Sequence, residues 1–121
     1  MTESEFWLFL EALWEERERA SMIAGTIDSP LFEIQTQNDY IGGHALLPNE
    51  HTQIPEQCIT DMGKLLFENV KQNTKEAILM ILAHQPTRKA LSILREYCKT
   101  PDENLRYFAE IALWECKMWN E

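Results

Sequence analysis

The sequence predicts an all-α protein built from antiparallel helical hairpins, with one irregular segment at about residues 26–54. Three observations support this prediction. Apolar residues recur at helical spacing in five segments, most of these segments open on a capping residue or a proline, and the connections after residue 55 are very short. The 121 residues fit a single domain, 1–121, and 45% hydrophobic residues suffice for a core.

The first predicted helix lies within residues 1–25. Thr2 and Glu5 have the spacing of a capping box at its start, and Gly25 is suited to ending it. Bulky apolar residues recur on one face, and carboxylates at i, i+4, i+7 spacing mark the opposite face as the outer one. The apolar face holds Phe6, Trp7, Leu10, Leu13 and Trp14, and the acidic face holds Glu11, Glu15 and Glu18.

The connection at residues 26–54 differs in composition from the rest of the chain. Residues 26–55 hold three of the five prolines and two of the four glycines. Ser29-Pro30 could open a short helix, whereas the alternation of Phe32 and Ile34 with polar residues favours a strand, which we expect only within 31–47. Helix, strand and loop therefore remain open here, and a long connection of this kind is often functional.

Residues 55–119 are predicted to form four helices in two hairpins. The predicted openings are Pro55, a second capping-box spacing at Asn73 to Glu76, Pro86-Thr87, and Thr100 to Glu103 with Pro101 as first helical residue. AILMILA at 77–83 is apolar all round, so this helix must be covered on nearly every side. The stretch at 65–73 resembles that at 93–101, a spacing of about 28 residues that suits stacked helical repeats.

The last predicted helix carries apolar residues on two opposite sides. We expect one side to face its hairpin partner and the other to be covered inside the protein by the N-terminal helix, an interface with another molecule being the alternative. The first side holds Leu105, Phe108, Ala109, Ala112, Cys116 and Trp119, and the second holds Tyr107, Ile111, Trp114 and Met118.

A family resemblance rests on the same region. The pattern D-x-x-[VL]-R-x-x-A-x-x-A-L is matched by Asp102, Leu105, Arg106, Ala109, Ala112 and Leu113. It resembles HEAT-like α-helical repeats, over about positions 55–119. The resemblance implies a short stack of helical hairpins, an α-solenoid or bundle, in which the Asp and Arg stabilise the turn, the alanines allow close helix contact, and the surfaces bind proteins.

Composition narrows the classes of function. A net charge of −9 opposes direct binding of nucleic acid and suits a basic protein partner. Cys58, Cys98 and Cys116 are too far apart for a zinc motif, and His44, His51 and His84 form no ligand pair, so we expect no metal, no cofactor and no catalytic residue. The absence of a signal peptide, of a membrane span and of a disulfide framework predicts a cytoplasmic protein.

The sequence therefore favours a non-catalytic protein-interaction module. Its sharpest form is an acidic bacterial immunity or antitoxin-like protein that masks a basic toxin, and the opening TESEFWLFLEALW resembles the starts of some small immunity proteins. The alternatives are a helical-repeat adaptor or subunit of a larger assembly, and an enzyme with a site at 26–54; a homodimer is also compatible. The predicted partner-binding residues are Asp28, Glu33, Asp39, Tyr40 and Glu50, with Glu11, Glu15 and Glu18 on the first helix.

Overall fold

The computed structural model describes residues 1–13 and 54–120, and all regular structure in these two ranges is helical. The predicted strand within 31–47, and the rest of the connection up to residue 53, lie outside the described residues. The described helices are α1 (Glu3–Leu13), α5 (Glu56–Leu66), α6 (Gln72–Ala83), α7 (Arg88–Lys99) and α8 (Arg106–Trp119), with a 3₁₀ turn η3 (Glu103–Leu105) before the last.

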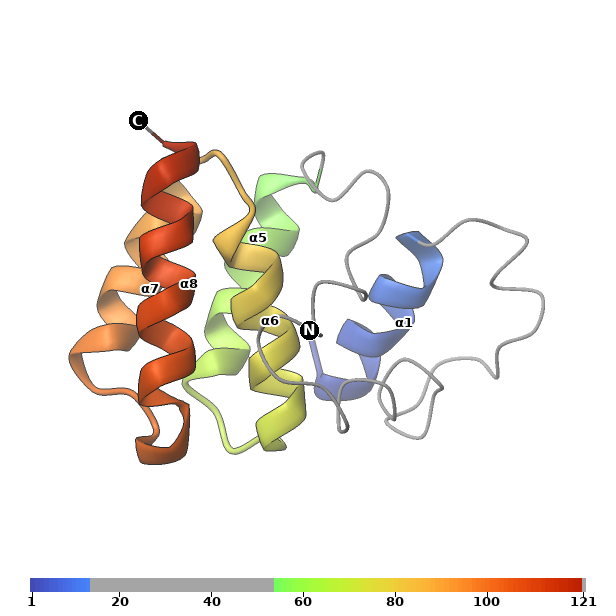
Figure 1. Cartoon of the computed structure of the whole chain (residues 1–121). Coiled ribbons are helices and arrows are strands. Elements are labelled where there is room, and N and C mark those ends of the chain that lie inside the picture. The colour runs from blue at the N-terminus through green and yellow to red at the C-terminus, as the bar shows by residue number, and fades with distance from the viewer. Residues whose placement is uncertain (14–53, 121) are drawn as a thin grey trace.

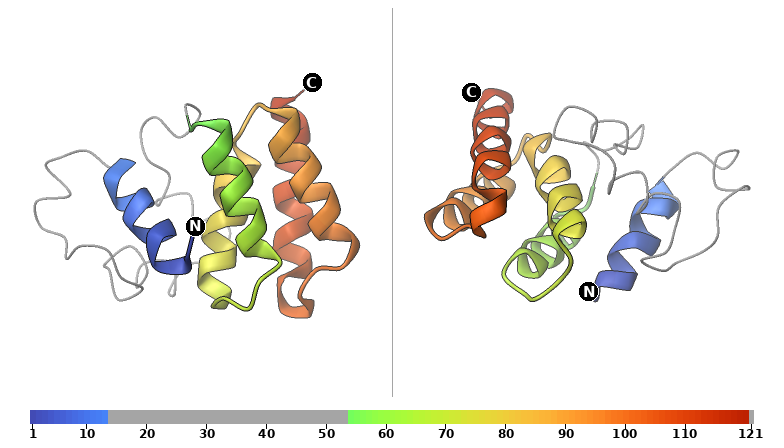
Figure 2. Two further views of the ribbon diagram at one scale, coloured as in Figure 1. Left: turned by 180° about the vertical axis from the view of Figure 1, so that it is seen from behind. Right: turned by 60° about the horizontal axis from the view of Figure 1, so that its bottom comes forward.

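Two antiparallel hairpins, α5–α6 and α7–α8, stand side by side (Figure 1). The connections within them are short, as the sequence predicts, and each returns the chain beside the preceding helix. Equivalent helices of the two hairpins also meet, since α5 packs against α7 and α6 against α8. Helix α1 lies at the far end of this row, on the side of α5 and α6 away from α7 and α8 (Figure 2).

Helix α6 is the centre of the core, as its all-round apolar sequence predicts. Every residue from Ala77 to Ala83 is at most 1% exposed. The helix is covered by α5, α7 and α8, and by the buried face of α1, whose Phe6, Trp7 and Leu10 are fully buried. Burial of this kind contributes roughly 1.5–3 kcal/mol for each large side chain, so α6 supplies much of the driving force for folding.

Where α5 crosses α7, close approach depends on a glycine. A Cβ atom at Gly63 would lie 2.7 Å from Cδ1 and 3.1 Å from Cγ2 of Ile93. Gly63 therefore lets the first helices of the two hairpins meet more closely than a larger residue would allow.

The start of α1 has the predicted capping box. The backbone N–H of Thr2 donates to Glu5 Oε1 at 2.7 Å, and the backbone N–H of Glu5 donates to Thr2 Oγ1 at 3.1 Å. Hydrogen bonds from the backbone and hydroxyl of Thr2 lower the pKa of Glu5. This prediction is confirmed because a capping box depends only on residues three apart.

The predicted capping box at Asn73 to Glu76 is wrong. Helix α6 begins at Gln72, and its N-cap residue, Lys71, caps it with no side-chain hydrogen bond. Instead, Glu3 of α1 accepts a hydrogen bond from the backbone N–H of Lys71 at 3.0 Å and another from the hydroxyl of Thr74. A carboxylate beside the positive end of a helix dipole is favourable, so α1 caps α6 from outside.

Trp7 joins the same cluster from within the core. Its Nε1–H donates to Thr74 Oγ1 at 3.0 Å, and both side chains are fully buried. Thr74 thus accepts from Trp7 and donates to Glu3. This chain of hydrogen bonds fixes α1 against the N-terminal turn of α6.

The last helix also starts later than predicted. Thr100 is the C-cap of α7 rather than the N-cap of a new helix, and the α-helical part of the last segment begins at Arg106 after the 3₁₀ turn. Asp102 is the N-cap residue of the 3₁₀ turn, with φ of −59° and ψ of 137°, and its carboxylate makes no capping hydrogen bond to that turn. It accepts hydrogen bonds from Tyr97 Oη at 2.5 Å and from Lys75 Nζ at 2.8 Å.

Candidate functional site

Helix α8 carries most of the exposed large apolar side chains of the described residues. Of the seven large hydrophobic side chains that are exposed in residues 1–13 and 54–120, four belong to this helix. Tyr107 is 76% exposed, Trp114 63%, Trp119 55% and Met118 48%. Exposed aromatic residues are frequent anchors at protein interfaces.

The expectation that the second stripe is covered inside the protein is therefore wrong. The inward stripe behaves as expected at Leu105, Ala109, Ala112 and Cys116, which are buried, whereas Phe108 is half-buried and Trp119, at the end of the helix, is exposed. The opposite stripe of Tyr107, Ile111, Trp114 and Met118 is half-buried at Ile111 and exposed elsewhere. The physical reason is topological, because α1 packs on α5 and α6 at the other end of the row and does not reach α8 (Figure 1).

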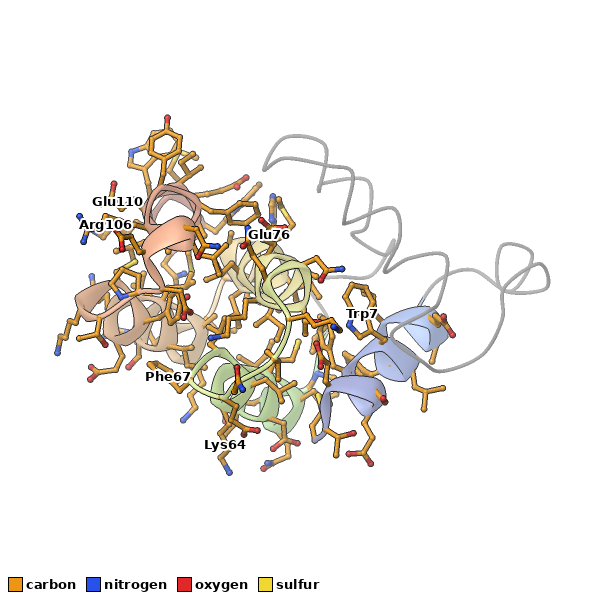
Figure 3. All side chains as sticks on the ribbon, turned by 90° about the horizontal axis from the view of Figure 1, so that it is seen from below. Trp7, Lys64, Phe67, Glu76, Arg106 and Glu110 are labelled. Carbon is orange, nitrogen blue, oxygen red and sulfur yellow. The ribbon has the colours of Figure 1, made fainter. Side chains whose placement is uncertain are left out.

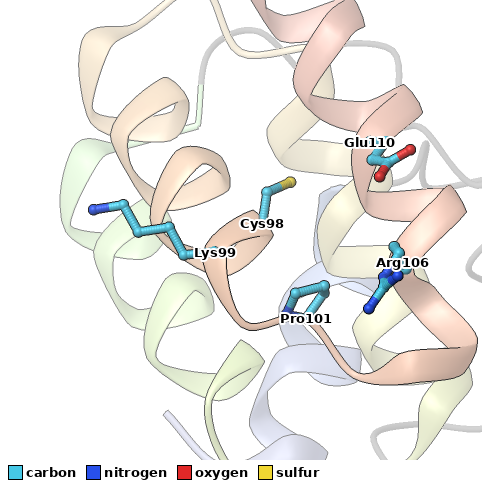
Figure 4. Close-up of a pocket in the computed structure, with 5 residues that line it drawn as sticks. All are labelled: Cys98, Lys99, Pro101, Arg106 and Glu110. Atoms are coloured by element: carbon cyan, nitrogen blue, oxygen red, sulfur yellow. The ribbon is translucent and has the colours of Figure 1, made fainter.

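A shallow hollow lies beside the exposed stripe of α8, between the C-terminal end of α7 and the start of α8. It has a volume of about 280 Å³ and is lined by Cys98, Lys99, Pro101, Arg106 and Glu110. The Cys98 thiol points toward α8, whereas Lys99 points away from it (Figure 4). A second hollow, of about 290 Å³, is lined by Arg88, Leu91, Arg95 and Asn120.

The three cysteines are free and chemically quiet. Burial raises the pKa of Cys58 and of Cys98, and it raises the pKa of Cys116 to about 11. The Cys98 thiol also donates to the Ala109 carbonyl at 3.4 Å. A thiol held in its protonated form is a poor nucleophile, so these residues act as small packing groups.

Among the described residues the one histidine is His84, and its contacts join two helices. Its Nδ1 lies 2.9 Å from the carbonyl oxygen of Met80, and its Nε2 lies 2.8 Å from Oε2 of Glu115, which links the end of α6 to α8. His44 and His51 lie outside the described residues. Within the two described ranges, no three His, Cys, Asp or Glu side chains come together in a way that could hold a metal ion.

Of the residues predicted to bind a partner, the structure describes only Glu11. Glu11 is only 6% exposed, so its assignment to the outer face of the first helix is wrong. It lies one turn after Trp7, which is fully buried. The others, Asp28, Glu33, Asp39, Tyr40, Glu50, Glu15 and Glu18, lie outside the described residues.

Charge is distributed unevenly along the chain. Residues 1–53 hold ten acidic and two basic side chains, a net charge of −8, whereas residues 54–121 hold ten acidic and nine basic, a net charge of −1. Within the stack, Arg106 and Glu110 lie on α8, on the side of the molecule away from Trp7 of α1 (Figure 3). The described acidic residues at the start of α1, Glu3 and Glu5, and the exposed aromatic residues of α8 therefore lie on helices at opposite ends of the row.

Sequence reasoning missed the Lys75, Tyr97 and Asp102 cluster. The Lys75 side chain is 9% exposed and projects from the central helix to reach a turn 27 residues away. Hydrogen bonds from Lys75 and then from Tyr97 lower the pKa of Asp102, and burial together with Asp102 raises the pKa of Tyr97. The one sequence signal for this cluster is Lys75 itself, a single lysine just before the apolar run at residues 77–83.

The chain shows no match to a known family model, to a curated protein or to a solved structure. No helix in the described ranges is long and apolar enough to cross a lipid bilayer.

Proposed function

We propose that this protein is a non-catalytic interaction module in which a HEAT-like helical stack presents an acidic surface to a basic protein partner. The observation that carries the proposal is the partition of charge: a net −8 in residues 1–53 against −1 in residues 54–121. A concentrated negative field accelerates encounter with a positively charged protein and repels nucleic acid.

The attachment of α1 supports a scaffold role for the stack. Glu3 and Trp7 bind Lys71 and Thr74 of the stack, and Phe6 and Leu10 are fully buried beside them. The segment that follows α1 in the sequence carries most of the acidic residues of the N-terminal half. The acidic and aromatic residues Asp39, Tyr40 and Glu50 belong to that segment, and we propose them as contact residues.

The sharpest form of the proposal is an immunity or antitoxin-like protein that masks a basic toxin in a bacterial cytoplasm. Small size, acidic charge and three thiol-form cysteines suit that role. A toxin gene next to the gene for this chain would support it.

The direct test is capture of partners from native cells with the tagged protein, followed by mass spectrometry. We expect a basic protein that is captured by the wild type and lost with the Asp39→Lys/Glu50→Lys variant. The control is Glu96→Lys, a single charge reversal at an exposed position of α7. Capture that survives the double reversal, or that fails equally with the control, contradicts the proposed acidic surface.

The second candidate function is a helical-repeat adaptor or subunit of a larger assembly. The exposed aromatic residues of α8 favour it, since Trp and Tyr are frequent anchors at interfaces. The same capture experiment separates the two, because an adaptor that works through α8 loses its partner with Trp114→Ala and keeps it with the reversals at Asp39 and Glu50. An enzyme with a site at 26–54 is the third reading, and a metal or small molecule carried through purification would favour it.

A further inference from the structure

We propose that the outer face of α8 is a self-association surface, on which a second copy of this chain docks its own α8 in antiparallel orientation. The face consists of Tyr107, Ile111, Trp114 and Met118. This inference does not depend on the proposed acidic binding surface, which lies in another part of the chain.

The spacing of the four residues suits a two-fold axis. Their intervals are four, three and four, which read the same in both directions along the helix. In an antiparallel pair centred between Ile111 and Trp114, Ile111 therefore meets Trp114 of the second copy. Tyr107 likewise meets Met118 of the second copy, a favourable contact between a thioether and an aromatic ring. Intervals of four and three are also those of a coiled-coil seam.

The charges beside the stripe select the antiparallel orientation. Glu110 and Lys117 are exposed on the same flank, and in the described part of the chain neither has an opposite charge within ion-pair distance. Antiparallel pairing in this register brings Glu110 beside Lys117 of the second copy, and the two-fold axis makes this pair twice. Parallel pairing would not bring Glu110 beside Lys117 of the second copy, so it lacks both of these pairs.

The size of the face indicates a weak dimer. From the exposed fractions of Tyr107, Trp114 and Met118, each copy offers about 400 Å² of these side chains. With Ile111 and the flanking residues, the two copies together bury about 1,000 Å², which is the lower end of the range for specific interfaces. The dimer should therefore dissociate on dilution.

The described residues around α8 place little net charge at this contact. Residues 54–121 are nearly neutral, and α1 lies at the opposite end of the row of helices from α8 (Figure 2). The acidic residues 1–13 of two docked copies are thus kept apart by both stacks, and repulsion is screened within about 8 Å at physiological salt.

Sedimentation equilibrium of the full chain, between about 5 and about 500 µM, tests the proposal. We expect the mass to rise from that of the 14.2 kDa monomer toward twice that value. Trp114→Ala should raise the dissociation constant about tenfold or more. The control is Leu8→Ala, which removes an exposed apolar side chain from α1 and should leave association unchanged.

A charge swap tests the register. Glu110→Lys and Lys117→Glu should each raise the dissociation constant about threefold or more, because each places like charges at both pairs. The double variant Glu110→Lys/Lys117→Glu should restore wild-type association, since it recreates the pairs with reversed sign. Far-UV circular dichroism during urea unfolding checks that each variant is folded.

Three results overturn the proposal. The first is a mass of 14.2 kDa at every concentration, which means that the chain stays monomeric. This result overturns self-association even if Trp114 proves necessary for the capture of a different protein. The second is a dimer that Trp114→Ala does not weaken. The third is a charge swap that fails to restore what the two single reversals remove.

Discussion

Replacement of Asp102 by asparagine probes the connection between the two hairpins. The carboxylate lies 2.8 Å from Lys75 Nζ and 2.5 Å from Tyr97 Oη, and Lys75 is 9% exposed while Asp102 is 44% exposed. Hydrogen bonds to charged groups contribute about 1.5–3 kcal/mol each. Because asparagine keeps one acceptor oxygen and Asp102 is partly screened by solvent, we expect a loss of about 1–2 kcal/mol in the free energy of unfolding at pH 7.

The loss should depend on pH in a defined direction. Hydrogen bonds from Lys75 and Tyr97 lower the pKa of Asp102 in the folded protein below its ordinary value of 3.8. Protonation therefore favours the unfolded state, so the stabilisation is complete above about pH 4 and disappears as the pH falls through the folded-state pKa. The Asp102→Asn variant has no carboxyl group to titrate at this position, and the difference in stability between the two proteins should shrink in that acidic range.

Urea unfolding followed by tryptophan fluorescence at several pH values measures both effects. Glu103→Gln is the control, because it removes the neighbouring exposed carboxylate and should change stability by less than about 0.5 kcal/mol. Lys75→Met allows a double-mutant cycle, in which the coupling to Asp102 should be positive. A difference between wild type and Asp102→Asn that is absent at pH 7, or equally large at pH 3, would refute this account of the turn.

Three further variants or reagents test the core. Thr74→Val removes the hydroxyl that accepts from Trp7 and donates to Glu3, and urea unfolding should show a loss of about 2 kcal/mol; an unchanged midpoint would mean that α1 is held by apolar contact alone. Ala109→Leu and Ala112→Leu should each lose about 1–3 kcal/mol, because both alanines are fully buried against neighbouring helices; a midpoint equal to the wild type would argue against that close packing. The Cys116 thiol, whose pKa is raised to about 11, should react with a thiol reagent at pH 8 only as fast as the protein unfolds, and rapid reaction would show that it is accessible.

Sequence patterns correctly predicted the features of the fold that depend on interactions between neighbouring residues. The capping box of Thr2 and Glu5, the burial of residues 77–83 and the N-cap of α7, where Thr87 accepts from the backbone N–H of Ala90 at 3.2 Å, are all present. Each depends on residues a few positions apart or on the apolar character of one helix.

The two wrong predictions of helix starts, at Asn73 and at Thr100, result from contacts between residues that are far apart in the sequence. Glu3 caps a helix whose N-cap residue is 68 positions away, so the apparent signal at Asn73 was not used. The helix start predicted at Thr100 is wrong, and Asp102, which precedes the 3₁₀ turn, makes no side-chain cap because its carboxylate accepts hydrogen bonds from Lys75 and Tyr97. No pattern within a short window of sequence contains the contact of Glu3 with Lys71 or that of Asp102 with Lys75.

The candidate site was predicted less well than the fold. The two stripes of α8 follow from helical periodicity, but helical periodicity does not say where α1 docks, and α1 contacts α6 through Trp7 and Thr74 and leaves the outer stripe of α8 exposed. Glu11 has the spacing of an outer residue and is nevertheless buried. The proposed contact residues Asp39, Tyr40 and Glu50 remain predictions.

The central claim, that acidic residues of the N-terminal half steer a basic partner, is tested most directly by stopped-flow association rates with the captured partner. The account predicts that the rate falls steeply as salt rises, and that Asp39→Lys/Glu50→Lys lowers it and flattens its salt dependence, whereas Glu96→Lys has a smaller effect. Rates that respond neither to salt nor to the reversals at Asp39 and Glu50 would contradict the claim.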